Sequence, residues 1–248
     1  IGGDNNSGLM ISGFMNVTGN MASGLHFSGV ANITGQSFGG LMASGLLNVV
    51  GEHMNGLQIA GIANITASKL NGVQVALCNY ATKARGLQIG LVNYYKEDMK
   101  GFQLGLVNAN PDTKVQMMVY GGNATPANIG VRFKNQLFYT ILGVGSMYQG
   151  LNDKFSASAS YRAGLSFPLY KGLSISGDLG YQHIEAFDNK DEVIPKRLYA
   201  LQARANLEYQ FTKKFGIFAT GGYGVTRFYN KSSNYDKGAI IEAGIVLF

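Results

Sequence analysis

The first half of the chain repeats a pattern of apolar residues, glycine and amide side chains. Units such as "GLHFSGVANITG", "GLQIAGIANITA" and "GLQIGLVNYYKE" begin at seven glycines: Gly8, Gly24, Gly40, Gly56, Gly72, Gly86 and Gly101. Their spacing is 16 residues four times, then 14, then 15. Such a fixed short period indicates a repeat architecture. Read with a period of two, each unit has an apolar face and a mildly polar face, which predicts β-structure.

Two architectures fit residues 1–113. In a β-solenoid each unit is one rung, and one asparagine per unit stacks into an amide ladder: Asn16, Asn32, Asn48, Asn64, Asn79, Asn93 and Asn108. In a membrane barrel each unit is one antiparallel strand whose apolar face contacts lipid. Charge favours the barrel, because Glu52 alone is charged between Asn5 and Ser68. A soluble surface of that size would carry many more charges.

Residues 114–248 alternate more plainly. In "LYALQARANLEYQF" one face is apolar with aromatic residues at both ends, and the other face is mostly polar. This is typical of a transmembrane β-strand. We expect eight such strands in this half, over 115–121, 127–134, 137–148, 155–169, 173–182, 198–211, 215–228 and 239–248.

The connections between these strands alternate in length. The links at 169–172 and 212–214 are tight, whereas those at 149–154, 185–196 and 229–237 are longer and polar. Outer-membrane barrels have short periplasmic turns and long outside loops. We therefore interpret the long links as outside loops and place the C-terminus on the periplasmic side.

Together these patterns predict an all-β fold, a single antiparallel transmembrane β-barrel over 1–248. Seven repeat strands and eight further strands give fifteen, whereas bacterial barrels of one chain have even strand numbers. We therefore expect about 14 strands, within a range of 14–16, and one falsely assigned strand around 114–134. The alternative is an N-terminal β-solenoid followed by an 8-stranded barrel.

The composition supports a membrane barrel and excludes several other classes. Only 14% of residues are charged, 46% are hydrophobic, and no apolar run reaches the length of a transmembrane helix. The net charge of +6 comes from scattered lysines and arginines, so no nucleic-acid partner is expected. The single cysteine, Cys78, excludes an internal disulfide. Because residue 1 follows no targeting segment, we expect a mature form whose signal peptide has been removed.

Charged residues with inward parity are the candidate site. They are Arg162, Asp178, Arg204, Glu208 and Glu242. The first three fall at similar heights on neighbouring strands, which predicts a cluster in the barrel lumen. Such a cluster serves either as a constriction that selects solutes or as an ion-pair network that stabilises the interior, and we favour the network. We predict no catalytic, cofactor or metal site, since even His183 with Asp188 is better explained as a solvated interface residue.

Two segments resemble known outer-membrane proteins. The final strand, "EAGIVLF", resembles the terminal aromatic signal of outer-membrane barrels. The "GLQIGLVN" units resemble the surface-repeat proteins of Bacteroidetes and Leptospira, in which G-ϕ-Q-ϕ-G-L-ϕ-N recurs before a C-terminal barrel region. The resemblance implies an outer-membrane or surface location and no established activity.

The functional expectation is a non-enzymatic barrel in the bacterial outer membrane. We expect a structural or accessory subunit that docks other outer-membrane components, with membrane lipid and other outer-membrane proteins or lipoproteins as partners. The alternative is a porin-like passive diffusion channel for small solutes. A barrel of about 14 strands is wide enough to leave a water path unless side chains or loops fill it.

Overall fold

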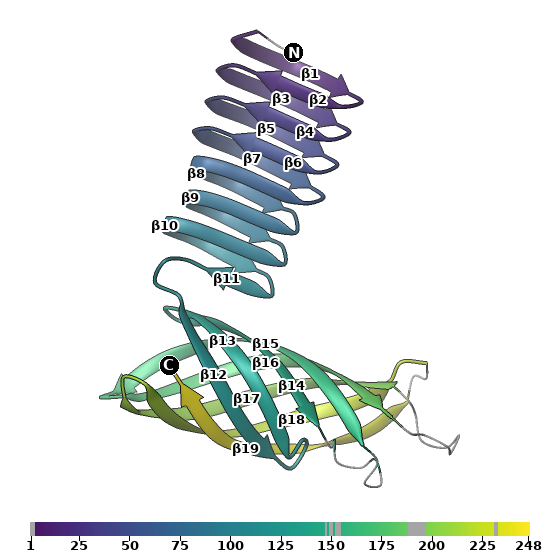
Figure 1. Cartoon of the computed structure of the whole chain (residues 1–248), viewed down its shortest axis with the longest axis vertical. Coiled ribbons are helices and arrows are strands. Elements are labelled where there is room, and N and C mark those ends of the chain that lie inside the picture. The colour runs from purple at the N-terminus through teal and green to yellow at the C-terminus, as the bar shows by residue number, and fades with distance from the viewer. Residues whose placement is uncertain (1–2, 147, 149–150, 152–154, 188–196, 231–232) are drawn as a thin grey trace. The chain divides into compact units, whose positions relative to one another are not determined.

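The computed structural model describes residues 3–146, 148, 151, 155–187, 197–230 and 233–248. The chain divides into two compact units, Ile1–Asp112 and Thr113–Phe248 (Figure 1). The strands of the first unit stack in parallel, and those of the second close into an antiparallel barrel. No helix in the described ranges is long and apolar enough to cross a membrane. The all-β class is confirmed, but the barrel has eight strands rather than about 14.

The first unit is a two-sided β-solenoid in which each repeat forms one rung. One side carries the strands that contain the repeat glycines, and the other side carries the strands that contain the asparagines. The longer strands β8, β9 and β10 run from one side to the other. The bounds are β1 (Asn5–Ser12), β2 (Met15–Thr18), β3 (Met21–Ser28), β4 (Ala31–Thr34), β5 (Ser37–Ser44), β6 (Leu47–Val50), β7 (His53–Ala60), β8 (Ala63–Val75), β9 (Cys78–Ile89), β10 (Val92–Leu104) and β11 (Val107–Ala109).

Equivalent residues of successive repeats lie directly beside one another. In the parallel register Gly40 pairs with Gly56, and Asn48 pairs with Asn64. The changes of spacing later in the repeat fall at the bend between Val75 and Cys78 and at register shifts between Thr66 and Lys69 and between Tyr95 and Asp98. Because these shifts lie between the two sides, the glycine and asparagine columns continue unbroken through all the rungs.

The repeat glycines are required by both backbone conformation and space. All seven have a positive φ, between 104° at Gly8 and 148° at Gly101, which L side chains rarely adopt. A Cβ on Gly56 would lie 2.1 Å from the carbonyl oxygen of Gly40 in the preceding rung. Glycine at this position therefore allows adjacent rungs to approach to hydrogen-bonding distance.

Two amide ladders run through the interior of the solenoid. Each asparagine from Asn16 to Asn93 donates its Nδ2 to the Oδ1 of the next asparagine, at 2.9 to 3.0 Å. The same Nδ2 groups also donate to a backbone carbonyl of the following rung, as in Asn64 to Val75 at 3.0 Å. From Gln74 to Gln103, each glutamine donates 2.8 Å back to the glutamine of the preceding rung. Buried amides thus satisfy one another, as buried polar groups must.

The direction of strand pairing explains why the repeat does not belong to the barrel. A rung and a barrel strand share the same alternation of polar and apolar positions, so the pattern itself does not distinguish them. In an antiparallel barrel, however, successive units would run in opposite directions, and equivalent asparagines could not form one ladder. The uniform spacing and the ladder residue are both satisfied by parallel stacking.

The second unit is a closed barrel of eight antiparallel strands in sequence order, with the last strand pairing to the first (Figure 1). All eight expected strands are present, including the two around 114–134, so none was falsely assigned. Their bounds are β12 (Lys114–Gly122), β13 (Ala127–Asn135), β14 (Phe138–Ser146), β15 (Ser156–Tyr170), β16 (Leu173–Ala186), β17 (Arg197–Thr212), β18 (Phe215–Phe228) and β19 (Asn234–Leu247).

The tight connections gather at one end of the barrel. Two-residue turns at 136–137, 171–172 and 213–214 join β13 to β14, β15 to β16, and β17 to β18. The C-terminal residue Phe248 lies at this end, where its N–H donates to the carbonyl of Lys214 at 3.0 Å. Parts of two of the three expected outside loops, 185–196 and 229–237, belong to strands, because β16 extends to Ala186 and β19 begins at Asn234. Most of 149–154 and all of 188–196 lie outside the described residues.

Candidate functional site: the barrel interior

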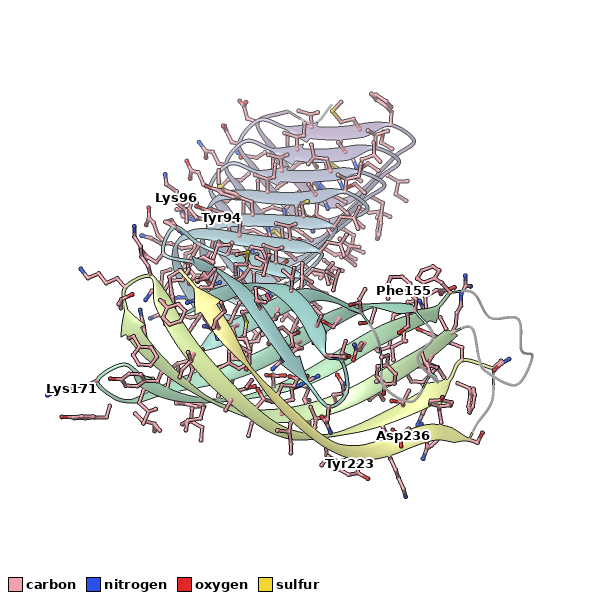
Figure 2. All side chains as sticks on the ribbon, turned by 60° about the horizontal axis from the view of Figure 1, so that its bottom comes forward. Tyr94, Lys96, Phe155, Lys171, Tyr223 and Asp236 are labelled. Atoms are coloured by element: carbon pink, nitrogen blue, oxygen red, sulfur yellow. The ribbon has the colours of Figure 1, made fainter. Side chains whose placement is uncertain are left out.

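The barrel has a polar interior and an apolar exterior. Along β17, Gln202, Arg204, Asn206 and Glu208 are buried, whereas Leu201 and Leu207 on the opposite face are each 49% exposed. The other long strands also place polar side chains inside the barrel and apolar side chains outside it. Figure 2 shows Phe155 and Tyr223 pointing away from the barrel. A β-strand sends alternate side chains to opposite faces. The period-two pattern in the sequence therefore determines which side chains enter the lumen.

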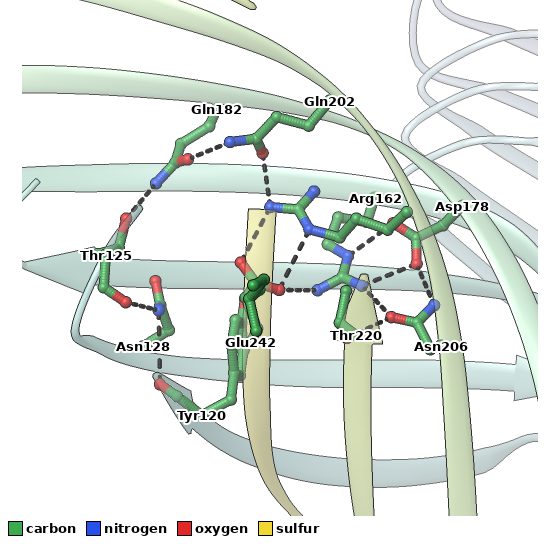
Figure 3. Close-up of polar contacts among 12 residues, drawn as sticks. Tyr120, Thr125, Asn128, Arg162, Asp178, Gln182, Gln202, Asn206, Thr220 and Glu242 are labelled. Carbon is green, nitrogen blue, oxygen red and sulfur yellow. Dashed lines mark hydrogen bonds and ion pairs between the residues drawn. The ribbon is translucent and has the colours of Figure 1, made fainter. Parts of the chain in front are cut away.

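Arg162 and Asp178 form the central contact of the interior. Arg162 on β15 donates through Nε and Nη2 to the two carboxylate oxygens of Asp178 on β16, at 2.8 and 2.7 Å (Figure 3). Asp178 also accepts from the Tyr139 hydroxyl at 2.8 Å and from Nδ2 of Asn206 at 2.9 Å. The side chains of the ion pair are 2% and 0% exposed. A two-pronged contact of this kind fixes both groups in orientation.

Glu242 on β19 joins this pair to Arg204 on β17. Its carboxylate accepts from Nε and Nη2 of Arg204, both at 3.2 Å, and its Oε2 lies 3.5 Å from Nη1 of Arg162. Arg204 also donates to Gln202 at 2.7 Å. Arg204 is the cross-strand neighbour of Asp178, but its carboxylate partner is Glu242. The predicted Arg162–Asp178–Arg204 cluster is thus bridged by Glu242, a residue predicted as an inward charge but not as a member of the cluster.

Glu208 is paired with Arg132, an arginine outside the predicted set of inward charges. Arg132 on β13 donates through Nη1 and Nη2 to the carboxylate of Glu208, at 2.6 and 3.0 Å. Its Nε donates to Gln116 at 2.6 Å. The signal for Arg132 was available, since it alternates with the apolar residues Ile129 and Val131 within the expected strand 127–134. No sequence signal indicated that β13 and β17 face each other across the lumen.

We refer to these six charged residues as the ion-pair belt: Arg132, Arg162, Asp178, Arg204, Glu208 and Glu242. Three positive and three negative charges balance within it. The Arg132–Glu208 and Arg162–Glu242 contacts join strands that are not neighbours in the barrel. The belt therefore crosses the lumen, and an eight-stranded barrel is narrow enough for side chains to fill.

Inward-facing glycines make room for the belt. A Cβ on Gly180 would lie 2.9 Å from Nη1 of Arg204 and 3.2 Å from Cγ of Arg162. A Cβ on Gly164 would lie 2.7 Å from Cβ of Asp178. Large charged side chains and glycines thus share the same level, and a side chain in place of either glycine would clash with the belt.

Two hollows lie at opposite ends of the barrel, one on each side of the belt. The hollow at the tight-turn end has a volume of about 470 Å³ and is lined by Lys114, Lys134 and Glu208, among others. The hollow at the other end has a volume of about 130 Å³ and is lined by Tyr148 and Asp236, among others. The ion-pair belt therefore lies between these two hollows.

His183, near the rim of the barrel, forms no catalytic arrangement with other side chains among the described residues. Nδ1 of His183 lies 2.6 Å from the Tyr229 hydroxyl, and Nε2 lies 3.4 Å from a carboxylate oxygen of Glu185. Asp188, its possible partner in the sequence, lies outside the described residues. Within the described ranges no three or more His, Cys, Asp or Glu residues gather as a metal site.

No family model and no curated protein matches the chain. Among solved structures, it is similar to Ail, the attachment invasion locus protein of Yersinia pestis, with 16% identity and a TM-score of 0.30, covering 54% of this chain and 92% of that one. It is also similar to Neisserial surface protein A, NspA, with 9% identity and a TM-score of 0.33, covering 54% of this chain and 93% of that one. These similarities are too low to assign a family or an activity.

Proposed function

We propose that the chain is a non-enzymatic protein of the bacterial outer membrane that acts as a structural or accessory subunit. In this proposal the barrel is a closed anchor in the bilayer. The solenoid is the part through which the protein docks other outer-membrane components. Membership of the surface-repeat family belongs to the same proposal, on the basis of the repeated G-ϕ-Q-ϕ-G-L-ϕ-N units.

The exterior of the barrel supports the membrane location. Leu179, Leu165 and Ile241 are among its outward residues and are 71%, 48% and 67% exposed. Such a continuous apolar exterior is unfavourable in water but suits the hydrocarbon of a bilayer. The eight strands contain between 9 and 16 residues, and a membrane strand needs about 9–11.

Aromatic residues at both ends of the apolar band also support this location. Tyr209 and Phe211 stack edge to face at the tight-turn end, with ring centroids 4.8 Å apart. Phe155 and Phe187 pack together at the opposite end, with centroids 5.9 Å apart. Aromatic girdles of this kind mark the two membrane interfaces. The tight turns then face the periplasm, together with the C-terminal end of β19.

The main support for the role of the barrel as an anchor is the ion-pair belt. A diffusion channel requires a continuous water path, whereas the belt fills the lumen with paired side chains drawn from opposite walls. Its charges are neutralised within the belt, so they are not presented to a passing solute. The porin-like alternative depended on the wider lumen of about 14 strands, and eight strands do not provide it.

Conductance in planar bilayers tests this proposal. The purified full chain should insert without steady open-channel current, with a general porin as the positive control for the bilayer. An Arg132→Ala/Glu208→Ala variant removes one crossing pair, and an Arg197→Ala/Glu185→Ala variant removes an exposed pair as its matched control. Steady currents of porin size from the unmodified chain would refute the anchor role. A silent chain that co-purifies with identified outer-membrane proteins would support it.

A further inference from the structure

The outer surface of the solenoid carries a continuous apolar wall. Five columns of outward positions begin at Leu9, Ile11, Phe14, Met15 and Val17 and run through all seven rungs. They contain only Ala, Val, Leu, Ile, Met, Phe, Cys and Tyr. Side chains are exposed along the length of the wall, since Phe14, Ile62 and Leu91 of one column are 65%, 51% and 48% exposed.

Charge is confined to the opposite corner of the solenoid. Between residues 5 and 109 every Asp, Glu, Lys and Arg lies outside the five columns. Lys83 and Glu97, for example, form an exposed ion pair at 3.1 Å in the segment that joins the two sides. The solenoid is therefore two-faced along its whole length, with a polar corner and an apolar wall.

The wall is larger than the apolar patches of ordinary soluble proteins. Six rung-to-rung intervals of roughly 4.8 Å give a length of about 29 Å. The eight residue steps from the first column to the last, at roughly 3.3 Å each, give a width of about 26 Å around the corner. The outline is therefore roughly 750 Å², above the 300–600 Å² typical of the largest patch on a soluble monomer.

Backbone groups along the wall are already hydrogen-bonded. At the bend between the two sides, the N–H groups of Val30 and Ala31 both donate to the carbonyl of Phe14, at 2.8 and 3.2 Å. Leu46 and Leu47 donate in the same way to Val30, both at 3.0 Å. Backbone that contacts hydrocarbon must have its polar groups satisfied within the protein. The stacked rungs meet that condition at this bend.

The shape and chemistry of the wall fit lipid better than a second copy of the chain. The wall bends around a corner, so two rigid copies could touch along the corners but could not cover both sides. Fluid acyl chains conform to a convex surface. Protein interfaces also carry about one hydrogen bond per 100–200 Å², whereas the wall offers polar side-chain atoms only at Cys78, Tyr80 and Tyr94. Tyrosines near one end of an apolar surface are typical of a membrane interface.

We propose that the apolar wall of the solenoid is a second membrane-contacting surface, immersed among lipid acyl chains, and that the polar corner faces water. The inference rests on the proposed membrane location of the barrel. Only four residues, 110–113, separate β11 from β12. A solenoid tethered by so short a link to a barrel that spans the bilayer has a raised effective concentration at the lipid surface.

The native cysteine makes this proposal testable in the full chain. Cys78 is exposed and belongs to the column that begins at Met15. It can be labelled with an environment-sensitive fluorophore in vesicles of phosphatidylethanolamine and phosphatidylglycerol. Quenching by nitroxide groups on the acyl chains is then compared with quenching by iodide in water. A Cys78→Ser/Leu46→Cys variant gives a second wall position, and Cys78→Ser/Gln36→Cys gives a matched position on the polar corner.

A fourth label, Cys78→Ser/Leu179→Cys, reports on the barrel exterior and separates the two proposals. We expect the nitroxide lipid to quench the labels at Cys78 and Leu46 about as strongly as that at Leu179, and iodide to quench only the label at Gln36. Iodide quenching at both solenoid faces, with lipid quenching at Leu179, would overturn the wall proposal and leave the barrel anchor intact. A dimeric mass with Cys78 shielded from both quenchers would overturn it in favour of a second copy. Lack of lipid quenching at Leu179 would refute the membrane location itself.

Discussion

Removal of Asp178 tests whether the ion-pair belt determines barrel stability. The Asp178→Leu substitution leaves Arg162, whose side chain is 2% exposed, without its two-pronged partner. Breaking a buried pair on one side costs about 3–5 kcal/mol, because an uncompensated charge remains. The contact between Arg162 and Glu242 at 3.5 Å persists in this variant, which places the expected loss toward the lower end of that range. Tyr139 and Asn206 also lose an acceptor.

The assay is urea unfolding of the full chain in detergent micelles, followed by circular dichroism. The matched control is Glu185→Leu, which breaks an exposed pair with Arg197 at 3.0 Å. Exposed pairs contribute about 0–1 kcal/mol. An Arg162→Met/Asp178→Leu variant removes both buried charges and should recover much of the loss, since apolar replacement of a buried pair is often neutral. If Asp178→Leu cost no more than Glu185→Leu, or if the double variant were the least stable of the three, the reasoning would be refuted.

Three further predictions concern the solenoid. Gly56→Ala adds a Cβ 2.1 Å from a carbonyl oxygen at a positive φ, so it should lower the unfolding midpoint of the full chain and open the repeat to proteolysis; Gly39→Ala, which meets nothing within 4 Å, should do neither. Asn64→Leu interrupts the chain of Oδ1-to-Nδ2 hydrogen bonds at one rung and should lower the free energy of unfolding in urea by about 1–3 kcal/mol, the penalty for an unsatisfied buried amide. A variant as stable as the unmodified chain would contradict a stabilising role of the ladder. Burial lowers the pKa of His26 below its usual value of 6.5. The unfolded chain therefore takes up the proton first as the pH falls, and the solenoid should lose stability below pH 6.5; His26→Gln should flatten this dependence in thermal melts, and an unchanged slope would contradict it.

Much of the barrel is predictable from the sequence because the alternation of polar and apolar residues along its strands has a single physical cause. A membrane strand needs an apolar face for lipid and a polar face for a narrow lumen, and β15, β16 and β17 display both. The five predicted inward charges all lie in the interior for this reason. Which charged residues pair across the lumen is not predictable in this way, since the pairing depends on barrel closure and shear. The pairing of Arg132 with Glu208 can therefore be identified only from the three-dimensional structure.

The repeat half shows the opposite limitation. The missing charge correctly indicates an unusual surface, but it does not reveal whether successive strands run parallel or antiparallel. The decisive signals were the uniform spacing of Gly24, Gly40 and Gly56 and the single asparagine per unit. Both have a structural reason only when equivalent residues lie side by side. The apolar faces of the units point outward in either architecture, which is why charge favoured the wrong one.

The asparagine ladder also bears on how such a chain can change in length. Each rung presents the same asparagine donor to the next rung and the same acceptor to the one before, so the asparagine contact is chemically equivalent at each junction between neighbouring rungs. Duplication or deletion of one 16-residue unit would preserve the asparagine ladder and the glycine column, whereas a change of one or two residues keeps both columns aligned only where it falls between the two sides, as at the register shifts beside Lys69 and Asp98. The solenoid can therefore vary by whole rungs, and its reach can be adjusted without altering the barrel.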